Sequence, residues 1–195
     1  MTEELPEEDL EARWPKDGDR LFISSAWAYD AHVIRDPKER FYRLPIGYKR
    51  AGDLLIEQAM ADVVDRRNVI YPILFCYRQS IELFLKQIIT DFGTPKEKLN
   101  HDLDTLWKQF LGIADERSNG GSEVLSAVQQ IVLDMHEADK KADGFRFATD
   151  RKQNPFEFGD RGIDLANLRE VMQGVTNFFE CVDQEFREQN DLSMM

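Results

Sequence analysis

The chain has 195 residues and a hydrophobic content of 42%, which is enough for one well-cored domain and short for two. Its formal net charge of −12 argues against a general DNA-binding surface, because such a surface needs a basic field. No apolar run reaches the length of a membrane helix, and the acidic N-terminus has no apolar signal core. We therefore expect a cytoplasmic protein with no membrane segment and no general affinity for DNA.

Residues 1–20 are expected to form a flexible acidic arm, since residues 1–19 hold eight acidic and two basic side chains. Residues 21–190 are expected to form the single domain, and residues 191–195 a frayed tail. The first part of that domain, residues 21–45, is rich in aromatic side chains but has no clean period. We expect an extended segment or short helix there, followed by a turn at Asp36-Pro37.

The sequence of the domain is dominated by one long stretch, Asn68–Gly93, which is predicted to be a helix. Pro72 is expected near its start, and Gly93 is placed to end it as a C-cap. Its apolar residues cover most of the helix circumference, as is typical of the buried member of a bundle. They include Leu74, Tyr77, Ile81, Phe84, Leu85 and Ile88. Only three residues suggest a solvated strip: Gln79, Ser80 and Gln87.

Three charged residues at helical spacing form a ladder on this stretch: Arg78, Glu82 and Lys86. Arg78 and Glu82 fall inside the apolar sector, four residues apart. Because an isolated buried charge is very costly, we expect these two side chains to pair.

Four further helices are predicted from hydrophobic periodicity, over residues 46–64, 101–114, 123–141 and 163–189. Asn100 or Asp102 is expected to cap the helix that starts at residue 101. In the break at residues 142–162, Phe145 and Phe147 alternate with Arg146, which indicates a short strand or an extended segment. The predicted class is all-α, a single-domain antiparallel bundle of about five helices.

Neither a metal nor a cofactor is indicated by the sequence. Cys76 and Cys181 both lie on predicted helices among apolar neighbours, so both are expected to be reduced core thiols. There is no CxxC, no glycine-rich dinucleotide or P-loop motif, and no HExxH.

The segment YRQSIELFLKQIITDFG (Tyr77–Gly93), followed by HDLDTLW (His101–Trp107), resembles the HEPN superfamily of nucleotide-binding helical domains. That family shows an R/Q-x-x-x-E-x-x-x-K helix and then H-D/S-L-x-x-L. The last predicted helix, in DLANLREVMQGVTNFFE, is similar to the closing helix of the family bundle. The resemblance implies binding of RNA or a nucleotide, a role in toxin–antitoxin or phage-defence modules, and a homodimer.

HEPN nucleases carry an R-x(4–6)-H motif, in which the histidine handles the 2′-hydroxyl proton and the arginine stabilises phosphate charge. The chain departs from this motif, because no arginine precedes His32, His101 or His136 at that spacing. An enzyme would therefore be an atypical metal-independent ribonuclease, with His101 and Arg78 as its catalytic residues.

The candidate ligand site combines the ladder and His101 with the basic segment that contains Arg146 and Arg151, around a phosphate-bearing ligand. In the alternative interpretation the ladder is a buried ion-pair network, His101 caps a helix, and the basic segment is a solvated loop. Three functions follow: a module that binds RNA or a nucleotide, a non-catalytic protein-interaction scaffold, or the atypical ribonuclease.

Overall fold

The computed structural model describes residues 14–22, 31, 33–94, 99–117, 123–150, 152–156 and 162–193. Over these ranges it contains five α-helices and, in place of any sheet, one isolated bridge between Thr149 and Pro155. The predicted all-α helical bundle is therefore confirmed. The chain divides into two compact units, Met1–Ile34 and Arg35–Met195, and all five helices belong to the second.

The first unit is described only in part, so most of the expected acidic arm lies outside the described residues. Residues 14–22 include a turn in which Asp19 N–H donates to the Lys16 carbonyl over 3.1 Å. Lys16 N–H in turn donates to the Asp19 carboxylate over 2.9 Å. The sequence places the start of the bundle at residue 21, whereas the compact second unit starts at Arg35.

Helix α1 spans Pro37–Ala61, so the expectation of a helix from residue 46 was wrong about its start. Asp36 is its N-cap and accepts a hydrogen bond from Glu39 N–H over 2.8 Å, and Pro37 occupies the first turn, where no N–H is needed. Pro45 lies inside the helix, which continues through it at the cost of one backbone hydrogen bond. The Pro45 carbonyl is buried and accepts a hydrogen bond from Ser80 Oγ over 2.8 Å.

Helix α1 also ends earlier than predicted, because Asp62 adopts an extended conformation and turns the chain. Asp62 Oδ1 accepts hydrogen bonds from Val64 N–H and Asp65 N–H, at 2.8 and 3.3 Å. Val63, which lies within the predicted helix 46–64, is therefore in an exposed turn, and Leu54 within α1 is also exposed.

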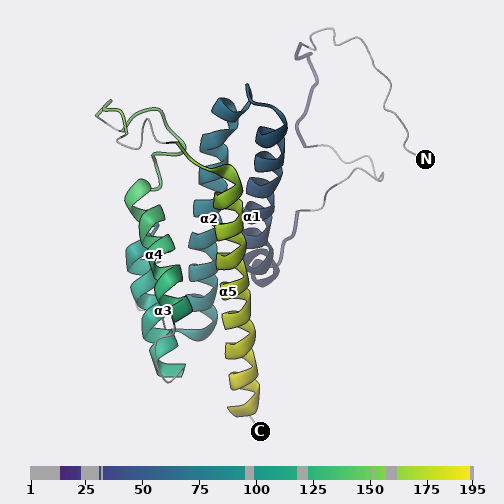
Figure 1. Ribbon diagram of the computed structural model, residues 1–195. Helices are drawn as coiled ribbons and strands as arrows, with labels where there is room; N and C mark the ends of the chain where they lie inside the picture. The colour runs from purple at the N-terminus through teal and green to yellow at the C-terminus, as the bar shows by residue number, and fades with distance from the viewer. Residues whose placement is uncertain are drawn as a thin grey trace, which may run out of the picture. The chain divides into compact units, whose positions relative to one another are not determined.

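Helix α2, Arg66–Phe92, is the central helix that was predicted from Asn68 to Gly93, and it packs against α1, α3 and α5 (Figure 1). No residue of α2 between Ile73 and Ile89 is exposed, so the expected solvated strip is wrong. Ser80 and Gln87 are buried, and Gln79 is half-buried. Gln87 Nε2 donates a hydrogen bond of 3.4 Å to the carboxylate of Asp183 on α5.

Gly93 does end α2, but not in the left-handed conformation that favours glycine: its φ is −100°. A β-carbon there would lie 2.7 Å from Ile113 Cδ1 and from the Ile89 carbonyl oxygen, so close packing explains the glycine. Pro72 lies in the second turn of α2 and not in its first, so the helix loses a hydrogen bond to the Asn68 carbonyl.

The remaining helices are α3 (Leu103–Arg117), α4 (Glu123–Ala138) and α5 (Leu165–Ser193). Figure 1 shows α3 and α4 as a hairpin beside α2, and α5 running alongside α1 and α2. Helix α5 continues three residues beyond the expected start of the frayed tail. Aromatic rings of three helices meet in the core: Phe84, Trp107, Phe110, Phe178 and Phe179. None of the five helices in the described ranges has both the length and the apolar character that a membrane span requires.

Two smaller expectations need correction. Cys181 is exposed on α5 and is not a core thiol, whereas Cys76 is half-buried on α2. Phe145 and Phe147 do not belong to a strand. They lie in a turn, because Arg146 N–H and Phe147 N–H both donate to the Asp143 carbonyl. Phe145 is buried in this turn and Phe147 is exposed.

Candidate functional site

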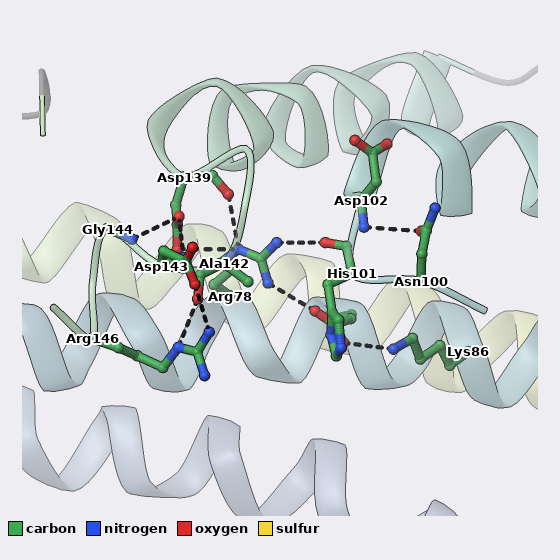
Figure 2. Close-up of polar contacts among 11 residues, drawn as sticks. Arg78, Lys86, Asn100, His101, Asp102, Asp139, Ala142, Asp143, Gly144 and Arg146 are labelled. Carbon is green, nitrogen blue, oxygen red and sulfur yellow. Dashed lines mark hydrogen bonds and ion pairs between the residues drawn. The ribbon is translucent and has the colours of Figure 1, made fainter. Parts of the chain in front are cut away.

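Arg78 is the centre of the polar cluster on α2, and its side chain is 1% exposed (Figure 2). Its Nη1 donates to Glu82 over 2.8 Å, so the predicted Arg78–Glu82 pair is present. Its Nη2 donates to the His101 carbonyl over 2.7 Å, and its Nε to the Asp139 carbonyl over 3.2 Å. The Arg78 guanidinium thus binds three groups of the protein itself, and it holds the His101 and Asp139 backbones against α2.

Glu82 is equally buried and accepts three hydrogen bonds from charged or ring nitrogens. Its Oε2 accepts from Arg78, and its Oε1 accepts from Lys86 Nζ at 2.7 Å and from His101 Nδ1 at 2.8 Å. Burial alone would raise the pKa of Glu82, but the hydrogen bonds from Lys86, Arg78 and His101 outweigh it and lower the pKa. The carboxylate is therefore ionised at neutral pH.

His101 precedes α3 but does not cap it. Asp102 is the cap, since its Oδ1 accepts a hydrogen bond from Thr105 N–H over 2.7 Å. The His101 side chain is 70% exposed while its Nδ1 is held by Glu82. An ionised carboxylate can only accept, so Nδ1 carries the proton and the neutral ring has Nε2 as its acceptor. Among the described residues, none forms a hydrogen bond to Nε2.

Asp139, which sequence reasoning missed, completes the cluster. It directly follows α4 and is buried, and its Oδ1 accepts hydrogen bonds from Asp143 N–H and Gly144 N–H at 2.9 and 3.0 Å. Its Oδ2 makes no hydrogen bond but lies 3.5 Å from Arg78 Nε, within ion-pair range. The turn-forming Ala142-Asp143-Gly144 marks a helix end in the sequence. Nothing in the sequence links Asp139 to an arginine 61 residues earlier.

Arg146 of the basic segment does not join this cluster. Arg146 Nη2 pairs with Asp143 at 3.0 Å and its Nε donates to the Ala142 carbonyl at 2.6 Å. Figure 2 shows Arg146 and His101 on opposite sides of the Arg78 guanidinium. Arg151 lies outside the described residues. The structure therefore brings together Arg78, Glu82, Lys86 and His101, and leaves Arg146 in a local interaction.

The chemistry of the cluster rests on one exposed ring and one ammonium group. The His101 Nε2 can accept a proton or a hydrogen bond, and Glu82 stabilises the ring if it becomes charged. Lys86 has three N–H donors, of which Glu82 takes one, and its side chain is 13% exposed. For the residues described, no three His, Cys, Asp or Glu side chains gather as metal ligands.

Comparison with known proteins found no similarity: no protein-family model matches the chain, and no curated protein or solved structure is significantly similar to it.

Proposed function

We propose that the protein binds RNA or a nucleotide at the surface that carries His101 and Lys86, as a HEPN-like helical domain of a defence or toxin–antitoxin module. The single observation behind this proposal is the hydrogen bond between the buried Glu82 carboxylate and Nδ1 of a largely exposed histidine. A ring held in one orientation with its other nitrogen accessible is suited to a phosphate or a ribose hydroxyl.

The charge of the protein limits the kind of binding to expect. With a net charge of −12, the molecule as a whole repels a polyanion, so only local groups attract one. Lys86 and His101 together can contact only one or two phosphates of a bound ligand. We therefore expect modest affinity for single-stranded RNA, with a slope of log K against log salt of roughly −0.7 per phosphate contacted.

The first test is fluorescence anisotropy of a labelled single-stranded RNA, titrated with wild-type protein, His101→Ala and Lys86→Met. We expect each variant to weaken binding about tenfold, the value of one charge-assisted contact. Lys38→Gln is the matched control, because it removes one positive charge from an exposed position at the start of α1. Circular dichroism establishes that each variant is folded.

Two results would refute the proposal: no binding of RNA or of AMP by the wild-type protein, or equal binding by wild type and a folded His101→Ala. If Lys38→Gln lost as much RNA affinity as Lys86→Met, the loss would be due to the change in net charge and not to a contact of Lys86.

A metal-independent ribonuclease is the catalytic extension of the same site, and the Glu82–His101 hydrogen bond favours it. In such a reaction the ribose 2′-oxygen attacks the adjacent phosphorus while Nε2 of His101 accepts the hydroxyl proton. The P–O5′ bond breaks, and the 5′-oxygen leaves as a hydroxyl that takes its proton from water. Cleavage that survives EDTA, leaves a 2′,3′-cyclic phosphate and disappears in His101→Ala would establish it. RNA that is bound but never cut would restrict the protein to binding.

The exposed apolar side chains of α1 favour a second candidate, a protein-interaction module. These residues are Phe41, Tyr42, Leu44 and Ile46. A second copy of this chain is the partner that the HEPN resemblance implies. Sedimentation of wild type and of Phe41→Glu tests it, since a homodimer formed through α1 would dissociate in the variant. A wild-type monomer at high concentration would exclude self-association.

A further inference from the structure

We propose that a cleft at the opposite end of α2 from Phe92 binds a small organic anion that carries a phosphate or carboxylate on an apolar body. The cleft has a volume of about 440 Å³ and lies between the α1–α2 turn and the first turn of α5. Arg66, Arg67 and Ile70 line it from α2, Met60 from α1 and Leu165 from α5. Its volume is within the range of small-molecule sites, roughly 300–1,000 Å³.

Arg66 supplies a fixed positive group to this cleft. Its Nε donates to the Ala59 carbonyl over 2.7 Å, and that carbonyl belongs to the last turn of α1, where helix carbonyls lack intrahelical partners. The hydrogen bond orients the guanidinium. Its Nη1 and Nη2 make no hydrogen bond or ion pair with any residue that the structure describes.

Arg67 supplies a second positive group and makes no side-chain hydrogen bond or ion pair within the described ranges. The acidic residues closest to it in sequence form hydrogen bonds with other groups and, among the described residues, no ion pair with Arg67. Asp62 accepts two backbone N–H groups of its own turn, and Asp65 accepts from Asn68 Nδ2 at 3.2 Å.

Asp164 is the acidic residue that lines the cleft itself, and it serves the start of α5. Its Oδ1 accepts hydrogen bonds from Ala166 N–H at 2.9 Å and from Asn167 N–H at 3.1 Å. These backbone donors stabilise the carboxylate, and two arginines against one aspartate give the residues that line the cleft a positive formal charge in a protein of net charge −12.

The rest of the lining is aliphatic, which determines the class of ligand. The apolar members are Met60, Ile70, Ile163, Leu165 and Ala166. Inorganic phosphate would leave this apolar surface uncovered, and a neutral hydrocarbon would leave two arginines without an anion. An anionic head group with an apolar body uses both features. The site shares no residue with the His101 cluster and does not depend on the function proposed for it.

The test is isothermal titration of the full-length protein with octyl phosphate, octanoate, 1-octanol and inorganic phosphate as probes. We expect saturable one-site binding of octyl phosphate or octanoate, with 1-octanol and inorganic phosphate at least about tenfold weaker. The ratio of octyl phosphate to octanoate affinity distinguishes a phosphate ligand from a carboxylate ligand.

Variants locate the binding. Arg67→Gln should weaken it about tenfold and Ala166→Trp, which fills the cleft from an exposed position, should abolish it, while Arg40→Gln on α1 should leave it unchanged. Circular dichroism verifies the fold. The proposal is overturned if neither anion binds saturably, or if binding is equal in wild type, Arg67→Gln and Ala166→Trp.

Discussion

The ring of Tyr77 on α2 lies directly against the backbone of Gly52 on α1. A β-carbon on Gly52 would approach Tyr77 Cε1 to 2.6 Å and Cδ1 to 2.8 Å, closer than atoms of side chains pack. The ring is held there because the Tyr77 hydroxyl donates to Asp53 Oδ1 over 2.9 Å. Burial, together with that hydrogen bond, raises the pKa of Tyr77, so the phenol remains a donor at neutral pH.

Gly52→Ala should therefore destabilise the fold. The added methyl group must displace a buried ring that is hydrogen-bonded at its far end, and such overpacking costs about 1–3 kcal/mol of unfolding free energy. Gly174→Ala on α5 is the matched control. A β-carbon at Gly174 meets nothing within 4 Å, so alanine should stabilise the helix by up to about 1 kcal/mol. Urea unfolding measures both, and equal stability of the two variants would contradict the close contact.

Arg78→Met should be among the most destabilising single changes in the protein, by about 3–5 kcal/mol, because it breaks a buried ion pair and leaves the Glu82 carboxylate with Lys86 and His101 as its remaining partners. Adding Glu82→Leu to Arg78→Met should recover part of that loss, since the buried Glu82 charge is then removed, while Asp139 still lacks the arginine that lies 3.5 Å from it in the wild type. A double-mutant cycle in urea measures the coupling. If the two losses simply add, Arg78 and Glu82 are not coupled and the pairing has no energetic role.

The stability that Glu82 contributes should depend on pH in a defined direction. The pKa of Glu82 is lowered in the folded protein from an ordinary value of 4.5, so the unfolded chain binds the proton more tightly. The contribution is then complete above pH 4.5 and is lost as the pH falls through the lower, folded-state value. The difference in unfolding free energy between wild type and Glu82→Gln should shrink over that acidic window. A difference that stays constant or grows there would contradict the sign of the shift.

The two cysteines should react with thiol reagents at very different rates. Cys181 is exposed on α5, whereas Cys76 is half-buried and burial raises the pKa of its thiol, which leaves less of the reactive thiolate. We expect one fast and one slow phase at neutral pH, with the fast phase absent in Cys181→Ser. In denaturant both thiols should react quickly. Two equal phases in the folded protein would mean that Cys76 is more accessible than its position on α2 indicates.

The sequence predicts the central helix and the Arg78–Glu82 pair well, because both depend on local spacing. A ladder of charges inside an apolar sector leaves few arrangements other than a buried pair. The start of α1 was not predicted although Asp36-Pro37 is a recognisable cap and first turn, because residues 21–45 are rich in aromatic side chains and show no clean helical periodicity. Tertiary contact through the Pro45 carbonyl stabilises the helix there.

What the sequence could not predict depends on contacts between distant segments. Gln87 was assigned to solvent because glutamine is usually exposed, yet its partner Asp183 lies 96 residues later. The contact between Asp139 and the Arg78 guanidinium likewise joins residues 61 positions apart, which no local pattern in the sequence indicates. Arg146 was expected beside Arg78, but an acidic residue three positions earlier offered a local partner.

The contacts of Arg78 also have a consequence for how the chain tolerates changes in length. Its guanidinium binds the carbonyl of His101, two residues before α3, and the carbonyl of Asp139, directly after α4. The chain therefore leaves α2 into the α3–α4 hairpin and returns from it at the same side chain, Arg78. Changes in length within the hairpin that keep these two carbonyls in place should leave the register of α1, α2 and α5 unchanged. The same hairpin could diverge in length among variants of this fold while Arg78 stays fixed.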